Sequence, residues 1–90
     1  MNVTNSAIQK MVAAITADLS RHLQIAVDQI ETEQVESVTW PDGSLGCPQP
    51  GYMYTQALVE GYRVTLKVAD KRFYYHTQGT QHFVRCDQEP

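Results

Sequence analysis

The most restrictive feature of this sequence is a proline- and glycine-rich segment near its middle. Residues 41–51 run Pro-Asp-Gly-Ser-Leu-Gly-Cys-Pro-Gln-Pro-Gly and contain three of the four prolines and three of the five glycines of the 90-residue chain. Proline has no backbone N–H to donate to a sheet and it breaks helices, so neither regular element is expected to run through this segment. We therefore expect a loop, stiffened by its prolines, that divides the chain into two parts.

Before the loop, the sequence predicts an amphipathic helix over residues 7–22. Its apolar residues recur at steps of three and four and form one stripe, which consists of Ile8, Met11, Val12, Ile15, Leu19 and Leu23. Residues 30–40 are rich in Val, Thr and Ile, which favours a strand, with a bulge expected near Gln34. We expect Trp40 to share a face of this strand with Ile30 and to meet the helix stripe in the core.

After the loop, the clearest strand covers residues 62–68, where apolar and polar residues alternate. A returning strand over residues 72–76 would complete a hairpin, and a short last strand covers residues 82–86. Residues 53–59 also favour a strand, which would end in a turn at residues 60–61. These elements predict an α+β fold, with one N-terminal helix packed on a small antiparallel sheet of about four strands.

Length and composition predict one domain over residues 1–90 and exclude several classes of partner. Hydrophobic residues make up 42% of the chain, as in globular proteins. The formal net charge of −3 lacks the basic excess that binds phosphate backbones, so no nucleic acid is expected. The sequence shows neither a bilayer-spanning apolar run nor a signal peptide. We therefore expect no membrane partner and a cytoplasmic protein, or an exported one if an N-terminal signal was removed.

The two cysteines and two of the histidines are residue types that bind zinc. Cys47, His76, His82 and Cys86 include no closely spaced cysteine pair. Residues four apart on a strand are separated by about 13 Å, so one metal would not reach both His82 and Cys86. A disulfide, two free thiols and a shared metal all stay open as states of the cysteines. A thiol or zinc protein is accordingly an alternative function.

Nothing in the sequence has the pattern of a catalytic site. The glycines match no phosphate-binding fingerprint, and no nucleophile elbow occurs. Asp42 and Asp70 fall in expected turns, where aspartate bonds its own backbone. Pro48 follows Cys47 directly, so no helix begins at this thiol to lower its pKa. We therefore expect no enzyme, no catalytic residue, no cofactor and no metal.

Aromatic residues flank the loop, with Trp40 before it and Tyr52 and Tyr54 after it. Such side chains are favoured at recognition surfaces, and loops carry function more often than cores do. We therefore predict a non-enzymatic binding or interaction module whose surface is the loop of residues 41–54. The predicted binding residues are Leu45, Cys47, Tyr52, Tyr54 and His76. The expected partner is a protein or peptide, and an exposed last strand allows a weak homodimer as well as a monomer.

Several short motifs in the second half of the chain resemble those of a known family. They are W-P-D-x-S-L-G-C-P-x-P-G at residues 40–51, Y-T-Q at 54–56, G-Y-R at 61–63 and Y-H-T at 75–77. This pattern resembles a family of small bacterial and cyanobacterial proteins of unknown function, so the resemblance implies no activity. Some of these relatives occur in exported proteins, which is compatible with a Cys47–Cys86 disulfide. The order of helix and strands is also loosely similar to PepSY-like and cystatin-like domains, which implies peptide binding or inhibition as a further alternative.

Overall fold

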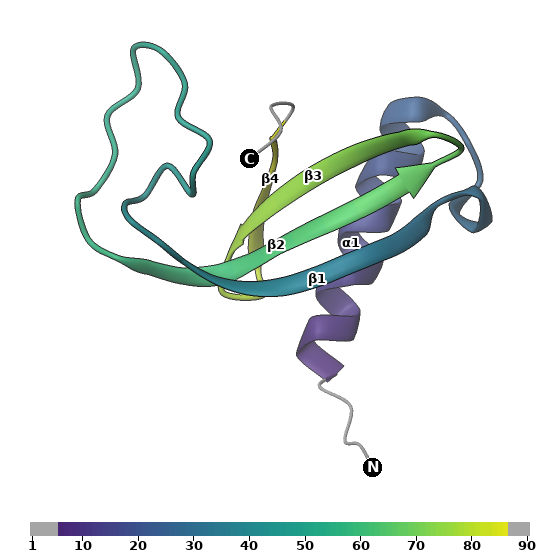
Figure 1. The fold of residues 1–90 in the computed structure, drawn as a ribbon, viewed down its shortest axis with the longest axis horizontal. Coiled ribbons are helices and arrows are strands. Elements are labelled where there is room, and N and C mark those ends of the chain that lie inside the picture. Colours follow the sequence, from purple (N-terminus) through teal and green to yellow (C-terminus); the bar gives the residue numbers. More distant parts are fainter. Residues whose placement is uncertain (1–5, 87–90) are drawn as a thin grey trace.

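The computed structural model describes residues 6–86, in which one long helix lies against an open antiparallel sheet (Figure 1). The elements are α1 (Ser6–Leu23), the short 3-10 helix η1 (Val27–Gln29), β1 (Glu31–Trp40), β2 (Val59–Val68), β3 (Lys71–Gln78) and β4 (His82–Cys86). The strands lie in the order β1-β2-β3-β4, and each neighbouring pair is antiparallel. The predicted α+β fold is therefore confirmed.

The main core forms between α1 and one face of the sheet. Its fully buried members are Met11, Ile15 and Leu19 from the helix, and Val64, Leu66 and Tyr75 from β2 and β3. The three helix residues are spaced by four, so they lie on one stripe, as the sequence predicts. Burying each such side chain contributes about 1.5–3 kcal/mol, which makes this contact the main stabilising layer of the fold.

A bulge in β1 changes which face of the sheet its residues occupy. The register with β2 shifts between Thr32 and Gln34, close to the predicted position. One extra residue reverses the alternation of side chains along a strand. Ile30, before the bulge, packs against the helix core, whereas Trp40, after it, lies on the opposite face together with Arg63. The prediction that Trp40 meets the helix stripe is therefore wrong, because the bulge turns Trp40 away from α1.

Gly61 lies inside β2 and not in the predicted turn at residues 60–61. The indole of Trp40 crosses over this glycine from β1 and donates its Nε1 hydrogen to the carbonyl oxygen of Thr77 on β3, 2.8 Å away. A Cβ atom on Gly61 would lie 1.8 Å from that carbonyl oxygen and 3.1 Å from the indole Nε1. The glycine is therefore needed for close approach between strands, not for chain reversal.

The strand boundaries differ from the predicted ones around the loop. Residues 52–58 form no strand, and β2 begins only at Val59. At the same end of the sheet, β3 continues through Gln78 because Thr77 and Gln78 pair with Phe83 and His82 of β4. Among the described residues, no helix has both the length and the apolar character that a membrane crossing would require.

Helix α1 covers one face of the sheet, and the long loop of residues 41–58 covers one end of the other face. Figure 1 shows this loop, in teal, extending past the end of the sheet where β1 ends and β2 begins. Its contact points with the sheet include Trp40, His76 and Cys86. The domain therefore has two separate packed clusters, one on each face, and the candidate site belongs to the second.

Candidate functional site

The cluster beneath the loop is centred on stacked rings of Trp40 and His76. Their ring centroids are 4.5 Å apart with an interplanar angle of 23°. Both side chains are buried, with 4% and 1% of their surface exposed. The guanidinium of Arg63, the cross-strand partner of His76, lies 5.7 Å from the centroid of the Trp40 ring. Arg63 also forms a 2.8 Å ion pair with Glu36, so its charge is held in place above the ring.

His76 connects β3 to the loop through one hydrogen bond. Its Nδ1 lies 2.8 Å from the carbonyl oxygen of Leu45. A carbonyl oxygen only accepts, so Nδ1 carries the hydrogen and donates it. Burial lowers the pKa of His76, the hydrogen bond to Leu45 opposes this, and the nearby positive charge of Arg63 lowers the pKa further. The ring is therefore neutral near pH 7, and its role in this structure is to hold the loop.

The first part of the loop is a compact turn seated on this cluster. The Asp42 carboxylate accepts hydrogen bonds from the Ser44 hydroxyl at 2.6 Å and the Ser44 backbone N–H at 2.9 Å, and both lower the pKa of Asp42. Leu45 follows with φ of 57° and is buried to 2% exposure. The left-handed conformation costs a leucine about 1–2 kcal/mol, which its burial of about 1.5–3 kcal/mol offsets.

Gly46 lets the loop lie directly on the stacked rings. Its φ of +72° is in the left-handed region. A Cβ atom there would come within 2.8 Å of Cζ3 of Trp40 and 3.6 Å of Nδ1 of His76. A larger residue at this position would therefore lift the loop from the indole face.

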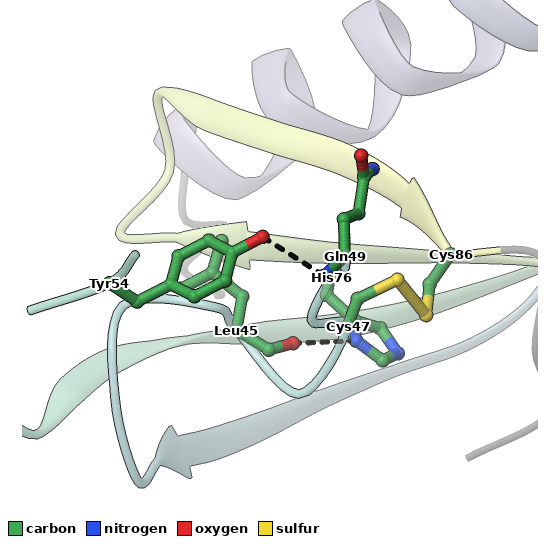
Figure 2. Close-up of a disulfide and its surroundings, with 6 residues drawn as sticks. All are labelled: Leu45, Cys47, Gln49, Tyr54, His76 and Cys86. Carbon is green, nitrogen blue, oxygen red and sulfur yellow. Dashed lines mark hydrogen bonds between the residues drawn. A yellow bond between two sulfur atoms is a disulfide. The ribbon is translucent and has the colours of Figure 1, made fainter. Parts of the chain in front are cut away.

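The next residue, Cys47, forms a disulfide with Cys86 at the end of β4 (Figure 2). The two residues are 39 positions apart, with a Cα–Cα distance of 5.8 Å, within the range that disulfides occupy. Neither cysteine of the chain is free. Within residues 6–86, no group of three or more His, Cys, Asp or Glu side chains is arranged to hold a metal ion. Of the states that the sequence left open, the structure therefore has the bridge.

The second part of the loop, residues 48–58, is fixed mainly by contacts within the loop. The N–H of Gly43 donates to the carbonyl of Thr55 at 2.8 Å and joins the two limbs. The hydroxyl of Tyr54 accepts a 3.0 Å hydrogen bond from the N–H of Gln49, as Figure 2 shows. The ring of Tyr52 stacks on that of Tyr54 at 6.4 Å. These contacts hold this part of the loop in a defined shape.

Apolar side chains in the C-terminal limb of this loop, residues 52–58, are open to solvent. Tyr52 is 67% exposed, Met53 97% and Leu58 72%. The sequence pattern pointed to Tyr52 but not to Met53 or Leu58. The sequence feature that could have identified them is that both are large apolar residues close to the proline- and glycine-rich segment. The structure shows that they belong to no helix or strand. We call Tyr52, Met53 and Tyr54 the loop tip, and Leu58 lies at the base of the loop, directly before β2.

The five predicted binding residues separate into two groups. Tyr52 and Tyr54 lie on the outer part of the loop, whereas Leu45 and His76 are buried beneath it. Cys47 is half-buried and engaged in the disulfide. The structure therefore brings Leu45, Cys47 and His76 together as a support for the loop, and leaves Tyr52 exposed and Tyr54 half-buried.

A groove separates the loop from β4. Its lining comes from the loop (Gly43, Ser44, Leu45, Cys47, Gln49 and Tyr54) and from His82, Val84 and Arg85 of β4. Its volume is about 120 Å³, well below the roughly 300–1,000 Å³ of typical small-molecule sites. It has room for one side chain or a few water molecules.

A larger hollow of about 370 Å³ lies elsewhere, between the end of α1 and the start of β3. Its cationic side chains already have partners, since Arg72 forms an ion pair with Glu33 and the Lys71 ammonium lies 5.8 Å from the Phe73 ring. Of its lining residues, Cys86 belongs to the disulfide that holds the loop. We therefore place the candidate site at the loop despite the greater size of this hollow.

The sequence matches one family over most of its length. Residues 12–86 match the family described as Domain of unknown function (DUF8738). The chain belongs to this family. The match includes the helix stripe from Val12 onward, the loop, the stacked rings and both cysteines. No curated protein and no solved structure matches the chain. The expected bacterial origin and the likeness to PepSY-like or cystatin-like domains therefore stay predictions.

Proposed function

We propose that this member of the family is a non-enzymatic binding module that recognises a protein or peptide through its loop tip. The observation that carries the proposal is the exposure of Tyr52, Met53 and Leu58 on a loop that is otherwise anchored. Tyr52 and Met53 are adjacent in the chain, and neighbouring large apolar side chains on the surface of a small domain mark interaction sites more often than isolated ones do. Tyrosine combines apolar area with a hydrogen-bonding hydroxyl, and methionine adapts its shape to a partner.

The support under the loop favours binding because it reduces the entropy lost on association. Leu45 is buried, Gly46 lies on the Trp40 ring and Cys47 is covalently joined to β4. A loop that is already ordered loses less freedom when a partner binds, so more of the contact energy appears as affinity. In this proposal Leu45, Cys47 and His76 act as supporting residues, and the loop tip makes the contacts.

The test begins with a photo-crosslinking amino acid in place of Met53, which is 97% exposed. The matched control carries the same amino acid in place of Val35, a 37% exposed residue of β1 outside the loop. We expect a crosslinked product at Met53 and not at Val35. If the molecule crosslinked through position 53 is a second copy of this chain, the protein forms a homodimer. If it is a different protein, that protein is the partner.

Affinity measurements with the crosslinked partner then test the loop tip itself. Tyr52→Ala and Met53→Ala are each expected to weaken binding about tenfold, the effect of losing about 1.4 kcal/mol at a central contact. Val35→Ala should leave the affinity unchanged, and all three variants should keep the melting temperature of the parent. Equal crosslinking at both positions, or unchanged affinity in both loop variants, would overturn the proposal.

The disulfide supports an oxidising compartment for the working protein, in place of the cytoplasm expected from the sequence. Cys47 and Cys86 are joined, and such bridges persist mainly in secreted, periplasmic or extracellular proteins. Intact cells are first quenched in acid, which protonates thiols and stops exchange, and free cysteines are then alkylated in neutral denaturing buffer. The unmodified fraction measures the bridge as it was in the cell. Alkylation of both cysteines in that experiment would contradict this assignment.

A further inference from the structure

The two clusters of the domain are built from different side chains on opposite faces of the sheet. The helix core consists of side chains on the α1 face, among them Ile15, Leu66 and Tyr75. The disulfide joins the loop to β4 on the opposite face, where Trp40 and His76 lie. No member of the helix core takes part in the bridge. Breaking the bridge therefore removes a constraint from the loop face without removing a contact from the main core.

The disulfide is the main attachment of the outer half of the loop. Up to Gly46, the loop is fastened by the Leu45–His76 hydrogen bond and the packing on Trp40. From residue 48 to 58, the hydrogen bonds found in the described part of the chain run to other loop residues, not to the sheet. The Cys47–Cys86 bond is thus the covalent tie that holds this half against β4.

One end of the bridge is accessible to a reductant. Cys86 is only 2% exposed. Cys47 is half-buried and lines the groove between the loop and β4. Thiol–disulfide exchange requires a thiolate to reach one sulfur in line with the S–S bond, so access decides which sulfur is attacked. The greater exposure of Cys47 favours its Sγ as the point of attack, with Cys86 as the leaving sulfur.

We propose that the Cys47–Cys86 disulfide is a redox lock on the loop, opened by a dithiol reductant. A thiolate of the reductant bonds to Sγ of Cys47, the S–S bond breaks, and Cys86 leaves as a thiolate that takes up a proton. The second thiol of the reductant then attacks the mixed disulfide, loses its proton and releases Cys47, which is protonated in turn. Two electrons pass from the dithiol, which becomes a disulfide, to the cysteine pair.

Opening the lock frees residues 47–58 while α1, β2 and β3 stay folded. The loop tip then loses its fixed position against β4, and binding through it weakens because that position must be restored on association. This last consequence rests on the proposed function. The local opening itself does not, since it follows from where the bridge lies.

Hydrogen–deuterium exchange with and without dithiothreitol tests the local opening on the full chain. In the reduced protein we expect peptides covering residues 47–58 to exchange at least tenfold faster, over exchange times at which peptides from α1 and β2 remain protected. The variant Cys47→Ser/Cys86→Ala should reproduce the reduced pattern without reductant. Glu33→Gln, which breaks the Arg72–Glu33 ion pair on the same face, is the matched control and should leave loop exchange unchanged.

Three results would overturn the lock. Unchanged loop exchange after confirmed reduction would show that the loop holds without the bridge. Equal loss of protection in α1 would show that the bridge holds the whole domain. Resistance of the folded protein to millimolar dithiothreitol would show that Cys47 is not accessible. None of these depends on a partner, whereas the loop-tip variants are tested in the oxidised protein, so failure of the lock and failure of the binding surface can be told apart.

Discussion

The Trp40 indole donates a hydrogen bond to the backbone carbonyl of Thr77 across the full width of β2, at a distance of 2.8 Å. This bond links the two strands that neighbour β2, which otherwise have no ladder between them. It also buries the only tryptophan of the chain on the loop face. The loop cluster is therefore built on a contact between strands that are not adjacent in the sheet.

The replacement Gly61→Ala should be strongly destabilising. Its Cβ would lie 1.8 Å from the Thr77 carbonyl oxygen, so the strands must separate or the indole must leave. We expect the free energy of unfolding, measured in urea, to fall by about 3 kcal/mol, the upper range for overpacking. Gly51→Ala is the matched control, because Gly51 has φ of +84° and an added methyl group would meet nothing within 4 Å. It should cost about 1 kcal/mol, and similar losses in both variants would contradict the close-approach explanation.

Stability should decrease as the pH falls below about 6.5. Burial lowers the folded-state pKa of His76, so below the unfolded-state value of about 6.5 the unfolded chain binds a proton that the folded chain does not. The contribution of His76 to the free energy of unfolding is complete above pH 6.5 and is lost as the pH falls toward the folded-state pKa. Over that range the free energy of unfolding falls by at most about 1.4 kcal/mol per pH unit. Urea unfolding between pH 7 and 5 measures it.

His76→Asn is the variant that isolates this pH effect. The Asn amide can donate to the Leu45 carbonyl but does not titrate, so the stability of this variant should vary less with pH over this range. His82→Asn, at an exposed position, is the control and should keep the dependence of the parent. The assignment to His76 is wrong if the His76→Asn variant shows the parental slope.

The intact mass of the oxidised protein should be two hydrogens, about 2 Da, below that of the reduced chain, because Cys47 and Cys86 are joined. The bridge spans 39 residues, and the chain-entropy estimate for a loop of that length is about 4 kcal/mol. The Cys47→Ser/Cys86→Ala variant should therefore unfold at a clearly lower urea concentration than the parent. A full-length mass without the deficit in the untreated protein would refute the bridge.

The substitutions Ile15→Ala and Leu58→Ala compare the effect on stability of truncating a buried side chain with that of truncating an exposed one. Ile15 is fully buried in the helix core, and its truncation is expected to cost about 2–5 kcal/mol through lost burial and the cavity left behind. Leu58 is 72% exposed, so its truncation should change stability by less than about 0.5 kcal/mol. Thermal unfolding of both variants is sufficient, and a large loss of stability in Leu58→Ala would mean that this side chain packs against the domain.

Local patterns in the sequence were sufficient for most of the fold. The helix follows from apolar residues at steps of three and four, and the hairpin of β2 and β3 from strict alternation. The loop follows from the proline and glycine density at residues 41–51. The glycine at position 61 misled the prediction, because a glycine in a strand and a glycine in a turn look alike until the neighbouring strands are known.

The sequence by itself determined the helix stripe, the succession of strands along the chain, the long loop and the aromatic residues beside it. Each of these depends on neighbours in the chain. Only the tertiary structure decided which face Trp40 occupies, that Cys47 meets Cys86, and that His76 lies buried under Leu45. One bulge in β1 reverses every side chain after it, and no local pattern states how many residues it inserts. The pairing of Cys47 with Cys86 depends on how the loop folds back over β4, a relationship between segments 39 residues apart.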